Sequence, residues 1–272
     1  MYIRYRAGPS SIGIALIGIA NAKTCNISPS LVASIGAISA EFEMSANRYE
    51  PPCTIARQFI EARDLLLRSR TDWQTARRAF RWPRLEYFNW AKHYFDYIAR
   101  DNDRCALRIV TDEGIDDSLT FRQLSSRSVQ MTRFMQRHGL APQDRVLVML
   151  RNVSSLWQVM LALIRMGGVI VPTTTLLQPD ELADRLTRGG IRGIITESQF
   201  TDRFDFLTAA PIRFSIGSGK GGWIDLAAAE AESVEPGETA ETRADDLLFL
   251  YLKVKIMGIV RPRVITAPAI LQ

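Results

Sequence analysis

The stretch from residue 120 to residue 196 constrains the fold most, because apolar runs of strand length alternate there with segments of helical period. Residues 145–150, 169–171 and 191–196 are short apolar runs bounded by turn residues, as in strands that are covered on both faces. Strand–helix–strand units with short connections require right-handed crossovers and a parallel sheet. The pattern therefore predicts an α/β fold in which helices flank a parallel sheet.

The helices of this stretch carry start and stop signals. Thr120 and Gln123 have the spacing of a capping box, and Pro179 suits the first turn of a later helix. We expect side chains from residues 152–155 to cap the helix between these two. Residues 106–119 predict an antiparallel hairpin before the first helix. Glycines stand where left-handed helix ends are expected, at Gly139, at Gly167 and Gly168, and at Gly189 and Gly190.

Several short sequence words occur here in a particular order and spacing. They are Phe88-Asn89-Trp90-Ala91, Thr120-Phe121-Arg122-Gln123-Leu124, Asp144-Arg145-Val146, Asn152 with Trp157, Gly167-Gly168-Val169-Ile170-Val171-Pro172-Thr173-Thr174-Thr175, and Asp180-Glu181-Leu182-Ala183-Asp184-Arg185-Leu186. Together they resemble the N-terminal subdomain of the AMP-forming acyl-CoA synthetases, and medium-chain acyl-CoA synthetases most closely. The resemblance covers residues 88–251 and implies the N-terminal part of an AMP-binding (adenylation) domain of an adenylate-forming ligase.

This resemblance implies a two-step reaction on a small carboxylic acid, either a medium-chain fatty acid or an aromatic acid. ATP converts the acid to an acyl-AMP, and CoA then takes the acyl group. The family holds the triphosphate with a Thr-Ser-Gly-Thr-Thr-Gly-x-Pro-Lys loop and Mg²⁺. Both are needed because the anionic carboxylate can approach the triphosphate only when the negative charge of the triphosphate is neutralised. Here residues 245–251 match the strand that precedes the loop, but Leu-Lys-Val-Lys-Ile-Met-Gly follows at 252–258.

The residues after that strand are poorly suited to holding a phosphate. Lys253 and Lys255 stand beside β-branched residues, which favour an extended chain, and no hydroxyl side chain follows before Thr266. We therefore expect a truncation or frameshift at Leu252, with a divergent, irregular tail over 252–272. We expect no catalytic residue, no metal ligand and no bound ATP, CoA or Mg²⁺ in this chain alone, and the sequence assigns no cofactor-binding residue.

Two other candidates for chemistry are weak. Residues 217–222 are glycine-rich like a phosphate loop, but a glycine follows Lys220 where Ser or Thr would bind Mg²⁺, so we expect a mobile surface loop. His138 precedes Gly139 at the end of a helix, where an imidazole favours the negative end of the helix dipole. No nucleophile or carboxylate partner is suggested near this histidine, so we expect a structural role.

Cysteine and histidine usage argues against a zinc site. The three cysteines, Cys25, Cys53 and Cys105, are scattered and lack CxxC spacing, and His93 and His138 are far apart in sequence. An odd number of unclustered cysteines fits a reducing compartment, so we expect a cytoplasmic location. Hydrophobic content of 47% and charged content of 23% are ordinary for a globular protein. The oligomeric state stays open.

The formal charge of +5 has a local origin, because residues 54–84 contain eight arginines against three acidic residues. One interpretation is a patch that binds nucleic acid or an acidic membrane surface. The other, which we favour, is a solvated helix face, with the apolar residues Ile55, Phe59, Ala62 and Leu66 behind it. We expect no nucleic acid partner and no stable membrane insertion. The alternative function is a non-catalytic module that binds a partner through this basic helix.

Residues 1–43 differ from the rest of the chain. Two arginines precede the apolar run at 12–20, as in a secretory signal, and this run is too short and glycine-broken to span a bilayer. The competing explanation is that translation begins at Met44 and that residues 1–43 are an untranslated or disordered extension. We favour the second, because export would separate a synthetase from ATP and CoA. Residues 44–87 then form an arginine-rich helical lead-in.

Overall fold

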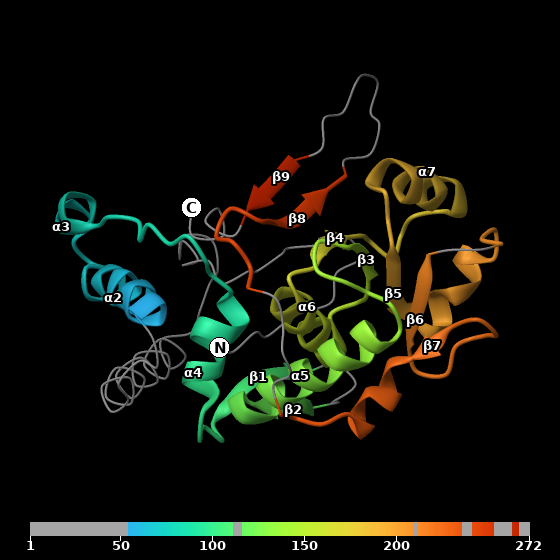
Figure 1. The fold of residues 1–272 in the computed structure, drawn as a ribbon, viewed down its shortest axis with the longest axis horizontal. Helices are drawn as coiled ribbons and strands as arrows, with labels where there is room; N and C mark the ends of the chain where they lie inside the picture. The colour runs from blue at the N-terminus through green and yellow to red at the C-terminus, as the bar shows by residue number, and fades with distance from the viewer. Residues whose placement is uncertain (1–53, 111–115, 209–210, 236–240, 253–262, 267–272) are drawn as a thin grey trace.

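The computed structural model of the chain describes residues 54–110, 116–208, 211–235, 241–252 and 263–266. A seven-stranded sheet forms its centre, in the order β7-β6-β5-β3-β4-β8-β9 (Figure 1). The strands are β3 Arg145–Met149, β4 Val169–Pro172, β5 Gly193–Glu197, β6 Ile212–Ile216, β7 Ile224–Asp225, β8 Leu247–Tyr251 and β9 Arg263–Thr266. Every neighbouring pair from β7 to β8 is parallel, and β9 runs antiparallel to β8. The predicted parallel sheet is confirmed.

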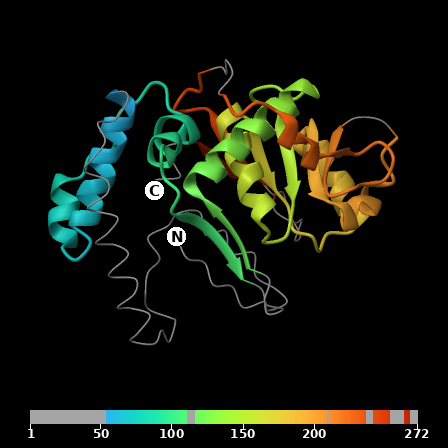
Figure 2. The same ribbon diagram turned by 90° about the horizontal axis from the view of Figure 1, so that it is seen from below.

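Helices cover both faces of this sheet (Figure 1 and Figure 2). Their bounds are α5 Phe121–Arg137, α6 Ser154–Met166 and α7 Pro179–Gly189, with the 3₁₀ helices η2 Ser198–Phe204 and η3 Leu226–Ala231. Strand β3 sends alternate side chains to two cores: Val146 and Val148 join α5, α6 and η3, while Leu147 and Met149 join α7 and η2. Because neighbouring strand residues point to opposite faces, one continuous apolar run supplies both cores.

The helix signals behave mostly as the sequence predicts. Thr120 caps α5 in a capping box with Gln123. Pro179 opens α7. The glycines that end α6 and α7 take left-handed conformations, as does the glycine just after α5: Gly139, Gly167 and Gly190. The expected side-chain cap of α6 is wrong. Val153 occupies that N-cap, no side chain caps the helix, and the Val153 N–H donates to the Arg151 carbonyl (2.9 Å).

An N-terminal helical part leads into this lobe. It comprises α2 Thr54–Arg68, α3 Trp73–Ala79, a π-helical segment η1 Trp90–Phe95, α4 Asp96–Ala99 and the antiparallel pair β1 Cys105–Val110 and β2 Asp116–Thr120. Helix α2 is anchored by Phe59, whose ring stacks on Phe88 (5.1 Å between centroids). Helices α2 and α3 stand at the edge of the molecule, away from the parallel sheet (Figure 2). The predicted hairpin is confirmed, and within the predicted lead-in the structure has helices at residues 54–68 and 73–79 but not at 80–87.

Part of the tail differs from expectation. Residues 263–266 form β9 and pair with β8, so this part is a strand rather than irregular chain. A strand at this place gives the backbone of β8 a hydrogen-bonding partner on the side away from β4. The predictions made for residues 1–53, 253–262 and 267–272 lie outside the described residues. In the part of the chain that the structure describes, no helix is both long and apolar enough to cross a bilayer.

Candidate functional site at the carboxyl edge of the sheet

The carboxyl ends of the parallel strands form the edge at which a ligand site is expected. In open α/β sheets, ligands bind where connections leave neighbouring strands in opposite directions. The chain goes from β3 to β4 on one side and from β5 to β6 on the other, and β3 and β5 are neighbours. The topology therefore places the expected crevice between the ends of β3 and β5.

An ion pair joins the ends of these two strands. Arg151 lies just beyond β3 and Glu197 is the last residue of β5. The backbone N–H of Arg151 donates to Glu197 Oε1 (2.8 Å), while its Nε and Nη2 donate to Oε2 (3.0 and 2.7 Å). Gln199 Nε2 donates to the same carboxylate (2.9 Å). The two strand ends are thus joined by charge-assisted hydrogen bonds, which are the stronger kind.

The two partners of this pair differ in environment. The Glu197 side chain is only 8% exposed, whereas that of Arg151 is more than half exposed. Burial by itself would raise the pKa of Glu197, but the hydrogen bonds from Arg151 outweigh it and hold the pKa below its ordinary value. The carboxylate is therefore ionised at neutral pH. Arg151 presents an oriented guanidinium at the edge, a group suited to carboxylates and phosphates.

The loop after β4 is held in place from η2. Arg203 Nη1 donates to the carbonyl of Leu177 (3.0 Å) and to that of Thr175. The hydroxyl of Thr173 donates to the Val171 carbonyl (3.3 Å), and that of Thr174 accepts from the Leu176 N–H (3.2 Å). These threonine side chains after β4 therefore form hydrogen bonds with nearby backbone groups.

The glycine-rich loop at 217–222 follows β6 at the same edge. Its Lys220 lies against two carboxylates, with Nζ 2.5 Å from Asp202 and 3.7 Å from Asp205. The hydrogen bond to Asp202 raises the pKa of Lys220, and this residue is exposed, as a surface loop requires. Two acidic side chains beside the only lysine of the loop would repel a phosphate. The geometry thus agrees with the sequence argument against phosphate binding there.

Strand β8 ends beside β4 at Tyr251, and burial raises the pKa of its phenol. Leu252 is buried, in the cluster with Val169 and Val171. Lys253 and Lys255, which follow in sequence, lie outside the described residues. Among the residues with a described structure, no group of three or more His, Cys, Asp or Glu side chains could hold a metal ion.

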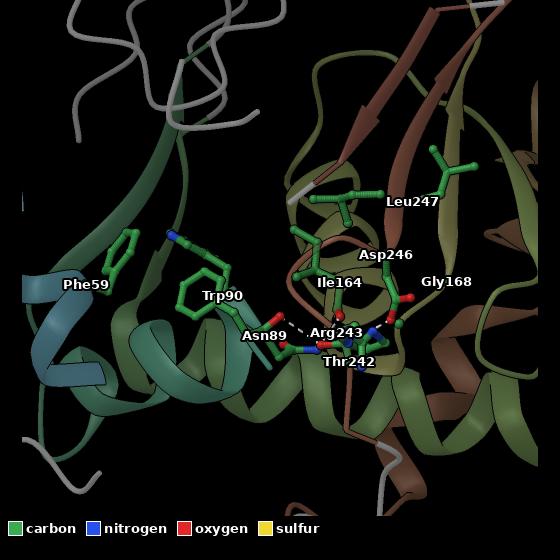
Figure 3. A pocket seen from close by; sticks show the side chains of 12 residues that line it. Phe59, Asn89, Trp90, Ile164, Gly168, Thr242, Arg243, Asp246 and Leu247 are labelled. Carbon is green, nitrogen blue, oxygen red and sulfur yellow. Dashed lines mark hydrogen bonds between the residues drawn. The ribbon is translucent and has the colours of Figure 1, made fainter. Parts of the chain in front are cut away.

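A small cavity lies at the opposite, amino edge of the sheet (Figure 3). It is lined by residues of the N-terminal helical part, among them Phe59, Asn89 and Trp90, and by residues that precede or begin β4 and β8. Its volume is ≈ 30 Å³, which is room for about two water molecules. Its size and its place both argue against a nucleotide site.

The histidines have structural roles. His138 at the end of α5 has its Nδ1 2.8 Å from the Phe134 carbonyl, and its ring packs on Phe134 at 4.3 Å between centroids. His93 Nδ1 accepts from the Asn89 N–H (2.9 Å), and burial lowers its pKa. A donated N–H and a lowered pKa both favour the neutral ring. The structural interpretation of His138 is supported, and neither ring has a catalytic partner among these contacts.

Comparison with known proteins then decides the family. The family model described as AMP-binding enzyme matches residues 95–251, more than half of the chain. The chain belongs to the AMP-binding enzyme family. The chain is 28% identical over 149 residues to the uncharacterised acyl–CoA ligase YtcI of Bacillus subtilis, and the alignment covers 54% of this chain and 28% of the relative. It is 25% identical over 178 residues to the human mitochondrial acyl-coenzyme A synthetase ACSM5, covering 61% of this chain and 31% of the relative.

Solved structures agree on the fold of this chain. The crystal structure of Brucella canis acyl-CoA synthetase matches with a TM-score of 0.54 at 23% identity, over 61% of this chain and 31% of that chain. The chain thus spans 28% to 31% of the length of these relatives. The shared part is the lobe that holds the parallel sheet, as the sequence words indicate.

Proposed function

We propose that this chain supplies the first lobe of an AMP-forming acyl-CoA synthetase, whose intact form activates a medium-chain or aromatic carboxylic acid with ATP and passes it to CoA. The main support is the match of the family over residues 95–251, which contain the parallel sheet from β3 to β8. The two relatives compared above are an acyl-CoA ligase and an acyl-coenzyme A synthetase by name. We place this activity in the cytoplasm, where ATP and CoA are available.

The described residues at the carboxyl edge do not fit ATP with Mg²⁺. Glu197, the buried carboxylate at the end of β5, is bonded to Arg151, and Lys220 is bonded to Asp202. The sequence after β8 reads Leu-Lys-Val-Lys-Ile-Met-Gly rather than a run of Thr, Ser and Gly. Backbone N–H groups can wrap a phosphate only where small residues let the chain turn closely. We propose that the chain alone does not form an acyl-AMP.

Pyrophosphate release tests this proposal. The purified chain is incubated with ATP, Mg²⁺ and a panel of medium-chain and aromatic carboxylic acids, with an active acyl-CoA synthetase as the positive control. We expect release at the rate of a no-enzyme blank. Acid-dependent release above the blank would contradict the proposed inactivity. A stable, monodisperse and inactive product would favour an interaction module over a decayed synthetase.

The nucleotide sequence around codon 252 gives a second test. If the expected frameshift is correct, another reading frame there encodes a loop rich in Thr, Ser and Gly that ends in Pro-Lys. If all three frames lack such a loop, the frameshift explanation is wrong, and the lobe belongs to a protein without the family's phosphate-binding residues.

A further inference from the structure

Helix α3 and the segment after it carry a surface that the synthetase lobe does not explain. We call this surface the α3 face, and it comprises Trp73, Arg77, Arg78, Arg81, Trp82 and Arg84. It stands at the edge of the molecule, on the side away from β5, β6 and β7 (Figure 1 and Figure 2). Large apolar side chains and arginines are therefore exposed within one short segment, in a part of the chain that lies away from the ends of β3 and β5.

The arginines of the α3 face make a local positive field. Four arginines fall within residues 77–84, and no acidic residue occurs from 73 to 85. Arg77, Arg78 and Arg84 form no ion pair with any carboxylate of the described residues. Of the two flanking acids, Asp72 caps α3 by accepting from the Thr75 N–H (3.0 Å), and Glu86 pairs with Arg243 (3.5 Å). Charges of one sign without local counter-charges attract an anionic partner.

Two exposed tryptophans lie among these arginines. Trp73, the first residue of α3, is 66% exposed, and Trp82 is 41% exposed. The ring of Phe80 meets that of Trp82 edge to face, with 4.8 Å between centroids, and supports it from one side. An exposed indole costs free energy in water, but it is favoured at the headgroup level of a bilayer, where one end is apolar and the other is wet.

We propose that the α3 face docks the chain reversibly on an anionic phospholipid surface. Arginines with interleaved tryptophans combine attraction to anionic headgroups with shallow apolar insertion. Nucleic acid shares the charge requirement, but its recognition needs a helix that fits a groove or a sheet of free stacking rings. Helix α3 has seven residues, and one ring of the face already packs against Phe80. The lipid surface is therefore the partner that the geometry favours.

Vesicle co-sedimentation of the full 272-residue chain tests this proposal. We expect binding to vesicles of phosphatidylcholine with phosphatidylserine, no binding to phosphatidylcholine alone, and weaker binding as salt is raised. The triple variant R77Q/R78Q/R84Q should bind about a hundredfold more weakly, because each arginine near an anionic surface contributes about fivefold. The matched control R122Q/R188Q/R192Q removes the same charge from other exposed arginines and should change binding by less than about threefold.

A second pair of variants tests the tryptophan independently of charge. Trp73→Ala should weaken vesicle binding several-fold, whereas Leu176→Ala, which removes an equally exposed (66%) apolar side chain elsewhere, should not. Absence of binding to the anionic vesicles would overturn the proposal. Equal losses of vesicle binding in the two triple variants would also overturn it. The same holds if R77Q/R78Q/R84Q binds vesicles as well as the parent chain does, or if Trp73→Ala does. Binding of a single-stranded oligonucleotide at lower concentrations than vesicles would replace the lipid surface by nucleic acid.

Discussion

Arg165 of α6 reaches across the core and binds both carboxylate oxygens of Asp96, at 2.7 and 2.6 Å. The arginine side chain is 4% exposed, and it also donates to the Ser128 hydroxyl (3.1 and 3.0 Å). Ser125 Oγ donates to Asp96 Oδ1 (2.6 Å). This network joins α4 of the N-terminal helical part to α5 and α6, so it fixes the N-terminal part against the sheet lobe.

Removing the acid from this pair should destabilise the fold strongly. Asp96→Ala leaves the buried Arg165 charge without its carboxylate, and we expect a loss of about 3 kcal/mol in the free energy of unfolding, measured in urea. The double variant with Arg165→Met should lose less than Asp96→Ala alone, because no unpaired charge remains. The matched control, Asp184→Ala, breaks an exposed ion pair with Arg188 and should cost no more than about 0.5 kcal/mol. Equal losses at the two sites would contradict this account.

Glu197 should make the stability pH-dependent in the acid range. Its folded pKa lies below the ordinary value of 4.5, so the unfolded chain binds more protons there and stability falls with falling pH. Glu197→Gln should cost about 2 kcal/mol near pH 7, where a charged acceptor is lost. The difference between the parent chain and the variant should then shrink as pH falls from 4.5 through the folded pKa. Unfolding curves at several pH values check this, and a constant difference would show that Arg151 does not bind the ionised carboxylate.

Gly167 should tolerate no side chain. Its φ of +76° is left-handed, and an added Cβ would stand 2.7 Å from Thr242 Cγ2. We expect Gly167→Ala to cost about 2 kcal/mol or more, since backbone strain and the close contact add. Gly221 has no neighbour within 4 Å of such a Cβ, so Gly221→Ala should lie within about 0.5 kcal/mol of the parent chain. Thermal unfolding compares the two, and a tolerated alanine at 167 would contradict the tight packing of α6 against Thr242.

Local sequence signals predicted the elements of this fold well. Thr120 and Gln123 are three residues apart, so their capping box can be predicted from the local sequence alone. Residues 145–150 read as a buried strand because every side chain after Arg145 is apolar. The cap prediction for α6 was wrong: Asn152 and Ser154 are good capping residues, but Val153 occupies the N-cap.

The contacts that join distant segments were missed. Arg151 and Glu197 are 46 residues apart in sequence. They meet because β3 lies between β4 and β5 in the sheet, and hydrophobic periodicity does not encode this strand order. A signal existed, since each of these charged residues stands at the end of an apolar run. The sequence also marks Arg165 as a buried charge, because it is the one charged residue among the apolar residues 159–166 of a helix. It does not indicate that Asp96 is the partner of this arginine.

The most direct measurement of the central claim is equilibrium dialysis of labelled ATP, with Mg²⁺ present, against the purified full chain. If the residues that follow β8 cannot wrap a triphosphate, bound nucleotide should rise in proportion to free nucleotide, without saturation up to about 1 mM. Saturable binding of one ATP per chain in the micromolar range would contradict the account, because it would require a triphosphate site where neither the sequence nor the described structure provides one.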